Sequence, residues 1–600
     1  MKPLARLNRF YWKYRRLFIP GLLCAMASAG FAILVPMVVR QSVDRIPAFV
    51  RTYRALGDTA AAGELSGAYF YTLAVFCLVI IGLSVFSGLF SFLMRQTVVV
   101  ASRHIEFGLR NDLYDHLQRL SPRFYIEKST GDIITRATSD IEQVRRYIGP
   151  ALMYLTRALV IVVVALVAMT IISPQLTMYA VIPMPFLGLA VFLVARLVNT
   201  RSDRLQKQYS TLTSRVQEAL SGVRVVKAYT REESEMGAFR RESDVYRRRM
   251  LDLAMVEAAF RPVFILLIGL STIIVVWIGG RLVIAGEITI GNIAEYIIYV
   301  ALMTWPVAAM GFVITMVQRA AASMVRLNEI MDALPEIDDD DATDVSVNAV
   351  RGDVEFADVS FRFGSDEPVV LDNVSFEVRA GQTCGIIGRT GSGKSTLVSM
   401  IPRMLDPVSG SIRVDGIDIR RIPIAVLRGS VGFVPQEVFL FSESVGENIA
   451  FGRPGATKDD VETAADRAEL LENVLEFRDG FDTRVGERGI AVSGGQKQRT
   501  SIARALVREP RILVFDDALS AVDTETERAI LQKLKAFAGD RTLMIVSHRV
   551  SAVQDADIIV VLDEGRVVES GRHDELIRNR GLYASLYIKQ LLEQEIESIG

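Results

Sequence analysis

The distribution of apolar residues divides the chain into two parts of different character. Long apolar stretches lie before about residue 320, whereas the rest alternates short apolar runs with polar segments. About twenty consecutive apolar residues are enough for an α-helix to cross a bilayer. The pattern therefore predicts six membrane-spanning helices, at roughly 18–39, 69–94, 151–172, 175–196, 260–284 and 292–317.

The positions of Lys and Arg predict how these spans are oriented. The N-terminus and two polar segments of about fifty residues, 95–150 and 197–259, are rich in both residues, whereas 173–174 and 285–291 are short connections. Cytoplasmic segments carry the excess of Lys and Arg. We therefore expect both termini and both long segments to be cytoplasmic, in a bacterial plasma membrane. An organelle membrane remains an alternative.

The N-terminal residues 1–17 are basic and aromatic. A cleaved signal peptide would continue with a short apolar run and a small-residue cleavage site, but the next apolar stretch is long enough to span the membrane. We expect an uncleaved amphipathic helix that lies on the inner membrane surface.

Each long polar segment has a helical pattern with a break near its middle, at Ser121-Pro122 in the first and at Gly222 in the second. This pattern indicates a helix that leaves the membrane, turns and returns. A pair of soluble helical hairpins without a transmitting role would give the same pattern.

Few charged residues lie within the predicted spans, and Arg157 and Glu295 are the clearest. Ionisable residues inside a membrane usually face a cavity or one another, and they often mark a functional site. The alternative for each is that it reaches an interface. Trp305-Pro306 and Gly311 predict a kink in the last span. The apolar, aromatic spans fit hydrophobic or amphipathic cargo.

Composition excludes some classes of function. Half of the residues are hydrophobic, and the formal net charge is −1. This charge argues against nucleic acid as a partner, because binding it normally requires a basic surface. Cys24, Cys77 and Cys384 lie far apart and show neither metal-ligand nor disulfide spacing. The acidic run from Asp338 to Asp341 fits a solvated linker within 331–349, between a membrane domain at 18–330 and a further domain at 350–600.

A phosphate-binding loop begins the chemistry of the C-terminal domain. An apolar strand at 383–387 leads into Gly388-Arg389-Thr390-Gly391-Ser392-Gly393-Lys394-Ser395, which matches G-x-x-x-x-G-K-[ST] and is followed by an apolar helix. The glycines let backbone N–H groups surround phosphates, and the helix N-terminus adds a favourable dipole. Lys394 is expected to contact the β- and γ-phosphates and Ser395 to bind Mg²⁺. A second apolar strand ends in Asp516, the acid expected to hold Mg²⁺.

Between these two motifs the sequence reads Val492-Ser493-Gly494-Gly495-Gln496, and here the chain resembles the ABC ATPase family. This signature sets that family apart from other P-loop proteins, although its usual first residue is Leu. The resemblance extends to bacterial multidrug and lipid exporters over nearly the whole chain. It includes a loop at 483–489 and two coupling stretches, at 131–136 and 222–227. It implies a multi-domain fold: an all-α six-helix transmembrane domain joined to an α/β P-loop ATPase domain. It also implies that short helices near 121–128 and 212–222 dock on the motor domains.

The resemblance also assigns roles residue by residue. Phe363 takes the place of the aromatic residue that stacks on adenine, Gln436 that of the Q-loop glutamine, 520–523 that of the D-loop, and His548 that of the switch histidine. The expected ATP contacts are Phe363, Gly388, Arg389, Thr390, Gly391, Ser392, Gly393, Lys394, Ser395, Thr396, Ser493, Gly494, Gly495 and Gln496. The expected Mg²⁺ contacts are Ser395, Gln436 and Asp516, and the expected catalytic residues are Asp517, His548 and Gln436.

One departure from the family changes the expected function. The family usually has Glu after the Mg²⁺ acid, as the base that polarises the attacking water, whereas this chain has Asp517. Aspartate is one methylene shorter, and a shortfall on the order of 1 Å can slow the reaction by orders of magnitude. In the family, each ATP lies between one chain's P-loop and the other chain's signature. We therefore expect a heterodimer in which this chain carries the weakly hydrolytic site and a non-identical partner carries Glu.

Three alternatives remain at this point. The first is a homodimeric exporter with both sites active. The second is an ATP-gated channel, although a pore would be expected to carry more charge along its spans. The third is a regulator that binds ATP without transporting anything, which six complete spans argue against.

Overall fold

The computed structural model describes residues 2–57, 60–364, 366–486 and 492–599, and these form two compact units. The helical unit comprises Met1–Gln118 and Thr130–Ala333, and the α/β unit comprises Arg119–Ser129 and Leu334–Gly600. The segment 119–129 therefore belongs to the α/β unit although it lies between two spans in the sequence. Within that unit, Ser121 Oγ accepts a hydrogen bond from the backbone N–H of Ile337 at 3.0 Å, and Arg123 pairs with Glu336 at 3.5 Å.

The described part of the helical unit contains six helices that are long and apolar enough to cross a membrane, which confirms the predicted spans. Each helix is far longer than the bilayer requires, because the polar segments continue the same helices beyond the apolar stretches. The elements are η1 (Lys2–Leu7), α1 (Asn8–Lys13), α2 (Arg15–Leu56), α3 (Ala60–Met94), η2 (Arg95–Val99), α4 (Val100–Arg119), α6 (Thr130–Thr135), η3 (Arg136–Asp140), α7 (Ile141–Arg146), η4 (Tyr147–Ala151), α8 (Leu152–Ile172), α9 (Pro174–Val181), α10 (Pro183–Ser221), α11 (Val223–Ala228), α12 (Glu232–Ile284) and α13 (Ile290–Met331).

Three of these elements, η2, η3 and η4, are π-helical turns of five residues each. They interrupt the second and third spanning helices, whose chain stays helical on both sides of each turn. Single π turns inside α-helices often occur at functional sites. All three lie in the first long polar segment, 95–150, or at its ends.

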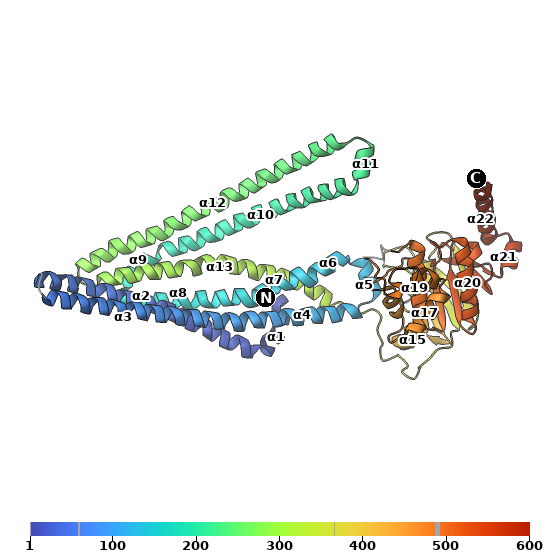
Figure 1. The fold of residues 1–600 in the computed structure, drawn as a ribbon, viewed down its shortest axis with the longest axis horizontal. Helices are drawn as coiled ribbons and strands as arrows, with labels where there is room; N and C mark the ends of the chain where they lie inside the picture. Colours follow the sequence, from blue (N-terminus) through green and yellow to red (C-terminus); the bar gives the residue numbers. More distant parts are fainter. Residues whose placement is uncertain (1, 58–59, 365, 487–491, 600) are drawn as a thin grey trace. The chain divides into compact units, whose positions relative to one another are not determined.

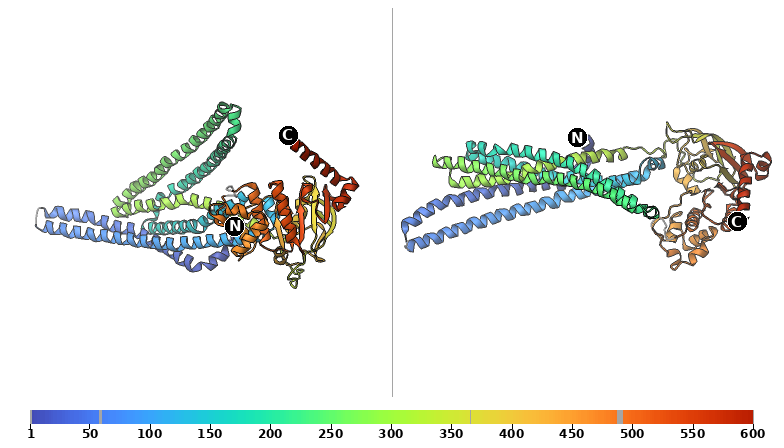
Figure 2. Two further views of the ribbon diagram at one scale, coloured as in Figure 1. Left: turned by 45° about the vertical axis from the view of Figure 1, so that its right-hand side comes forward. Right: turned by 90° about the horizontal axis from the view of Figure 1, so that it is seen from above.

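The second long polar segment differs in detail from the sequence expectation. The expected short helix at 212–222 is the end of α10, and the separate short helix, α11, begins only after Gly222. Figures 1 and 2 show α10 and α12 running side by side with α11 at their shared end. In the first segment, the short helix α5 (Pro122–Glu127) begins at the predicted break and lies within the range 121–128 that the resemblance implied.

Glu295 has a structural explanation. Its side chain is fully buried on α13, where Arg40 of α2 approaches it at 3.4 Å and the hydroxyl of Tyr299 donates to it at 3.1 Å. A buried charge is tolerated when it is paired and hydrogen-bonded. Glu295 therefore joins the first and last spans. Pro306 lies inside α13, which remains helical around it.

The α/β unit is built on two sheets. The four-stranded antiparallel sheet has the order β2-β1-β4-β5, and the six-stranded sheet has the order β10-β9-β3-β8-β7-β6. In the larger sheet only the β10–β9 pair is antiparallel. The strands are β1 (Val354–Phe361), β2 (Leu371–Val378), β3 (Thr383–Gly388), β4 (Ser409–Val414), β5 (Ile417–Asp418), β6 (Val431–Val434), β7 (Ile512–Asp516), β8 (Thr542–Val546), β9 (Ile558–Asp563) and β10 (Arg566–Gly571). The two strands predicted at 383–387 and before Asp516 are both present, as β3 and β7.

Helices cover the larger sheet and complete its apolar cores. β3, β7 and β8 are almost entirely buried, as the unbroken apolar runs in their sequences imply for parallel strands. The carboxyl ends of these three strands meet at one edge, where ligands bind in open α/β sheets. The helices are α14 (Lys394–Ser399), α15 (Ile424–Ser430), α16 (Val445–Ala450), α17 (Lys458–Arg467), α18 (Leu471–Leu475), η5 (Gly480–Asp482), α19 (Gly494–Leu506), α20 (Thr524–Ala538), η7 (Val550–Ala552), α21 (His573–Asn579) and α22 (Leu582–Ile599).

Candidate functional site

The predicted phosphate loop is a tight turn between β3 and α14. Its glycines are required by the geometry: a Cβ at Gly388 would collide with the carbonyl oxygen of Leu562, and Gly393 has a φ of +95° with Leu371 only 2.8 Å from where a Cβ would be. Lys394 Nζ donates to the carbonyl oxygens of Gly388 and Arg389 at 2.9 and 2.8 Å. The ammonium group of Lys394 is therefore held by the backbone carbonyls of its own loop.

Burial lowers the pKa of Lys394, although the carboxylates of Asp516 and Asp517 favour its charged form. Burial likewise raises the pKa of Asp516, against the effect of the hydrogen bond from Ser395. The half-buried ammonium group of Lys394 and the buried carboxylate of Asp516 thus lie in a site where water screens their charges poorly. Such a place strengthens any interaction with a phosphate or a metal ion.

Two of the three predicted metal residues are in direct contact, and the third lines the same cavity. Ser395 Oγ donates to Asp516 Oδ1 at 2.9 Å, which joins the start of α14 to the end of β7. Gln436 lines the cavity that Ser395 and Asp516 also line. A hydroxyl, a carboxylate and an amide oxygen are the hard oxygen donors that Mg²⁺ prefers, so these residues fit the expected ion.

One cavity of about 250 Å³ gathers most of the predicted site. It is lined by residues 390–396, Gln436, Asp516, Asp517 and His548, together with a few neighbours. Phe363 is not among its lining residues and instead packs edge-on against Phe361, with ring centroids 5.0 Å apart. The signature residues 493–496 also lie outside its lining. The described α/β unit thus brings the phosphate, metal and candidate catalytic residues together, but not the signature.

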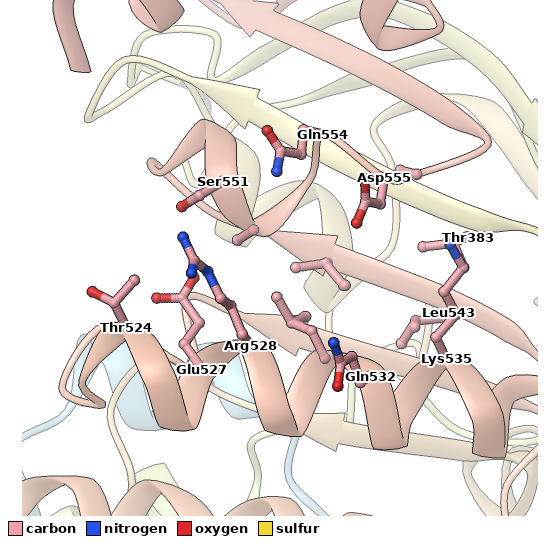
Figure 3. A pocket seen from close by; sticks show the side chains of 14 residues that line it. Thr383, Thr524, Glu527, Arg528, Gln532, Lys535, Leu543, Ser551, Gln554 and Asp555 are labelled. Carbon is pink, nitrogen blue, oxygen red and sulfur yellow. The ribbon is translucent and has the colours of Figure 1, made fainter. Parts of the chain in front are cut away.

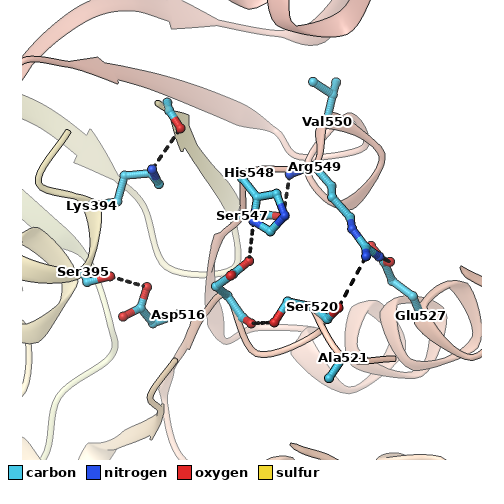
Figure 4. Close-up of polar contacts among 12 residues, drawn as sticks. Lys394, Ser395, Asp516, Ser520, Ala521, Glu527, Ser547, His548, Arg549 and Val550 are labelled. Carbon is cyan, nitrogen blue, oxygen red and sulfur yellow. Dashed lines mark hydrogen bonds and ion pairs between the residues drawn. The ribbon is translucent and has the colours of Figure 1, made fainter. Parts of the chain in front are cut away.

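Asp517 and His548 contact each other. His548 Nδ1 is 3.0 Å from Asp517 Oδ1 (Figure 4). Asp517 follows β7 with a φ of +49°, in the left-handed region that Asp and Asn tolerate best among non-glycine residues. Its backbone N–H donates to the carbonyl of Val546 at 2.9 Å, which holds this unusual residue beside β8. Two of the three candidate catalytic residues are therefore in contact, and the backbone of one of them is bonded to β8.

The signature forms the start of α19. Ser493 caps the helix in a reciprocal box with Gln496, at 3.2 and 2.9 Å. Two residues later, Gln498 donates to Ser520 Oγ at 3.1 Å and accepts from the backbone N–H of Ala521 at 3.0 Å. The signature helix is therefore bonded to the segment that follows Asp517.

Sequence reasoning missed three polar residues that connect these parts. Gln498 is one, and Arg549 and the buried Glu527 are the others. Arg549 bonds Glu527 at 2.9 Å and the carbonyl of Ser520 at 3.3 Å (Figure 4). No spacing in the sequence marks these contacts, although Arg549 directly follows His548. They link the segment after His548 to the segment after Asp517.

A second cavity of about 240 Å³ lies beside this network. Figure 3 shows Arg528, Gln532 and Lys535 of α20 opposite Ser551, Gln554 and Asp555. It contains none of the predicted site residues, and its rim mixes both signs of charge.

The loop expected at 483–489 is described only in part. Arg484 pairs with Ser444 in an isolated bridge, and the backbone N–H of Val445 bonds the carbonyl of Thr483 at 3.0 Å. Residues 487–489 lie outside the described residues. In the rest of the chain that the structure describes, no group of three or more His, Cys, Asp or Glu residues could hold a metal ion.

Comparisons with known proteins agree with this arrangement. Residues 18–307 match the family described as the ABC transporter transmembrane region, and residues 371–520 match the family described as ABC transporter. The chain is 38% identical over 524 residues to a probable multidrug resistance ABC transporter ATP-binding/permease protein, YheI of Bacillus subtilis (strain 168), covering 85% of this chain and 89% of that protein. It is 34% identical over 518 residues to an ATP-dependent lipid A-core flippase of Chromohalobacter salexigens, covering 86% and 89%.

A solved structure covers nearly the full length. A bacterial Atm1-family ABC exporter with ATP bound is similar with a TM-score of 0.76 and 27% identity, over 96% of this chain and 98% of that one. Both units described above therefore have counterparts in one known architecture.

Proposed function

The chain belongs to the ABC transporter family, and from this premise we propose that it is one half of a heterodimeric exporter, in which its own ATP site hydrolyses slowly. It is a multi-pass protein of the bacterial inner membrane that binds ATP and couples ATP hydrolysis to export. The partner, the chemistry of the individual site residues and the cargo are the proposed parts.

The division of the site between two chains rests on one observation. The cavity around Lys394 lacks the signature residues, which begin α19 outside its lining. In the family arrangement each ATP is covered by the signature of a second chain. Ser493, Gly494, Gly495 and Gln496 are intact here and are available to complete a site on a partner.

Each residue of the cavity has a proposed role. Lys394 and the backbone of residues 390–396 bind the phosphates, and Ser395, Asp516 and Gln436 hold Mg²⁺, which neutralises phosphate charge when it is bound. Phe363 contacts adenine after it turns from Phe361. His548 contacts the terminal phosphate, and Asp517 orients the attacking water.

The weak point of this site is Asp517. Its carboxylate is held at 3.0 Å by His548, and its backbone is fixed beside Val546, so a backbone shift that would extend its reach has to break these contacts. An active pair therefore requires a partner with the longer Glu at the equivalent position. A homodimer would place two short carboxylates in two identical sites.

The cargo is proposed to be hydrophobic or amphipathic. The relatives named above are a multidrug resistance protein and a lipid A-core flippase. The spans of this chain carry large exposed apolar side chains such as Phe92, Phe192 and Trp277. Both termini are proposed to be cytoplasmic, from the distribution of Lys and Arg.

The test is to purify the tagged chain from its native membrane with its bound partner. We expect a second ABC half-transporter with Glu at the catalytic position. After reconstitution in proteoliposomes, the pair should accumulate a fluorescent amphipathic dye with Mg-ATP and lose this activity when the partner's Glu is replaced by Gln. Purification of this chain with only itself, together with ATP-driven uptake, would contradict the heterodimer and establish a homodimeric exporter.

A further inference from the structure

Arg157 is a charge within the third predicted span, and no ion pair within the described residues accounts for it. It lies on α8, six residues after η4, and its side chain is half-buried. Among the described residues no carboxylate lies within ion-pair distance of Arg157, whereas Glu295 has Arg40 and Tyr299. An unpaired cation inside a membrane is unfavourable unless it faces water or a ligand, so the surroundings of Arg157 decide its role.

Arg157 lines a cavity of about 430 Å³. The same cavity is lined by Arg95, and no acidic residue lines it. Tyr154 and Trp305 face each other there, with ring centroids 5.8 Å apart. The two guanidinium groups supply only hydrogen-bond donors and positive charge toward a ligand, and the phenol hydroxyl of Tyr154 can add another donor. This is the chemistry that recognises a phosphate or a carboxylate.

A second cavity adjoins the first and is almost purely apolar. It has a volume of about 330 Å³ between α8, α10 and α13, and the two cavities share Ala158 and Pro306 as lining residues. Its other walls include Leu159, Phe192 and Ile314. No charged side chain lines it. It therefore suits a hydrocarbon chain and would exclude an ionic head group.

The backbone supports a binding role for the charged cavity. Arg95 is the first residue of the π turn η2, and the π turn η4 ends immediately before α8, three residues from Tyr154. Such turns often occur at functional sites, because the extra residue re-aims the side chains that follow it. Arg95 thus lies in a π turn, and Arg157 lies on the helix that directly follows one.

We propose that these two cavities form a binding site for an anionic amphiphile, whose acidic head group contacts Arg157 and Arg95 and whose hydrocarbon chain enters the apolar cavity. The proposal rests on the export function proposed above and narrows its cargo from hydrophobic or amphipathic compounds to negatively charged ones. It also assigns Arg157 as a specificity-determining residue.

The test measures binding through Trp305. The chain has three tryptophans, so Trp12→Phe with Trp277→Phe leaves Trp305 as the sole reporter inside the charged cavity. This full-length protein, in detergent micelles, is titrated with phosphatidylglycerol brominated on its acyl chains and, separately, with phosphatidylcholine brominated in the same way. We expect quenching of Trp305 at roughly tenfold lower concentrations of the anionic lipid, as one additional charge contact would give.

Substitutions identify the residues responsible. Arg157→Gln and Arg95→Gln should each remove the preference for the anionic lipid, and Arg157→Lys should retain much of it. The matched control is Arg281→Gln, which removes a positive charge from α12 outside both cavities and should preserve the preference. Equal quenching by both lipids, or a preference that survives Arg157→Gln and Arg95→Gln, would overturn the proposal.

A competition distinguishes two sources of the ligand. Displacement of the brominated lipid by monododecyl phosphate supports a site that also accepts soluble anionic amphiphiles, and failure of displacement supports a site for two-chain lipids. Because quenching needs no ATP, its outcome is separate from that of transport. If the reconstituted pair exports dye while Trp305 shows no preference, only the binding site is refuted; a preference without any transport refutes only the export function.

Discussion

His548 Nδ1 lies 3.0 Å from the carboxylate of Asp517, so two of the three expected catalytic residues are in direct contact within one chain. The contact restrains an acid that is already one methylene shorter than the family's usual Glu. Asp517 occupies a left-handed backbone conformation, which leaves it little freedom to compensate.

The first prediction concerns this acid. Asp517→Glu should raise the Mg-ATP turnover of the purified chain in nanodiscs by up to about 100-fold, because it restores the reach of a water-orienting carboxylate. Asp517→Asn, which has the same length as Asp but no negative charge, is the control and should not raise turnover. Brisk turnover by the unmodified chain would contradict a slow site. If neither the unmodified chain nor Asp517→Glu hydrolyses ATP, the measurement is repeated with the co-purified partner.

A second prediction concerns the helical unit beyond the membrane. Arg136 is 8% exposed and donates to Asp132 and Glu329, at 2.9 Å each, and to the carbonyl of Arg326 at 2.6 Å. Arg136→Ala should lower the free energy of unfolding by about 3 kcal/mol, because it removes a buried side chain together with its hydrogen bonds to these three acceptors. Arg146→Ala on the neighbouring helix removes only a surface pair with Glu142 and should cost about 0.5 kcal/mol or less. Thermal unfolding in detergent compares the two.

Glu295 and Arg157, the two span charges singled out above, should behave differently. Glu295→Gln should destabilise the chain by about 2 kcal/mol, because the fully buried carboxylate accepts from Arg40 and Tyr299. Arg157→Gln removes no hydrogen bond or ion pair among the described residues and should leave the unfolding temperature within about 1 °C of the unmodified value. The same detergent unfolding assay measures both. A larger effect of Arg157→Gln than of Glu295→Gln would contradict this assignment.

Cys384 should resist alkylation until the α/β unit unfolds. Burial raises its pKa from 9.0 to about 12, so at pH 8 the thiolate fraction is about 1000-fold below that of a free thiol. With Cys24→Ser and Cys77→Ser in place, a maleimide should react slowly with the native protein and rapidly in denaturant. Reaction at the free-thiol rate under native conditions would show that the thiol is exposed.

The same thiol predicts a pH dependence of stability. The unfolded chain loses the thiol proton above about pH 9, whereas the folded chain keeps it up to about pH 12. The unfolded state therefore binds fewer protons in this window, and the stability contributed by Cys384 is full below pH 9 and falls as the pH rises toward 12. Cys384→Ala should show a smaller loss of stability over the same pH range, as measured by denaturant unfolding.

The sequence predicts best those features that depend on residues adjacent in the chain. Six spans follow from uninterrupted apolar stretches. The loop at 388–395 follows from glycines between a strand and a helix, and a Cβ at Gly388 or Gly393 would collide with neighbouring atoms. The pairing of Arg40 with Glu295 could not be anticipated, because the two residues are 255 positions apart and no local pattern connects them. The contacts of Gln498 and Arg549 were missed for the same reason.

Helix boundaries in the polar segments were harder to predict. Gly222 was correctly identified as a break, but the short helix follows it rather than precedes it, because α10 remains helical up to Ser221. The π turns cannot be recognised from their residue types. For example, η2 consists of Arg, Gln, Thr and two Val residues, which also occur in ordinary α-helices. Their presence depends on packing, as at Gly149 of η4, where a Cβ would lie 2.7 Å from the hydroxyl of Ser102.

The π turn at Arg95–Val99 also changes which side chains of α3 and α4 share one face of the continuous helix. Each residue advances an α-helix by about 100°, so one extra residue rotates everything after it by that angle. A cysteine-accessibility scan that follows one face of α3 will therefore lose its period at Arg95 and regain it on α4 one position later. A relative that lacks this turn would present a different set of α4 side chains to the same neighbours, even where its sequence aligns without a gap on either side.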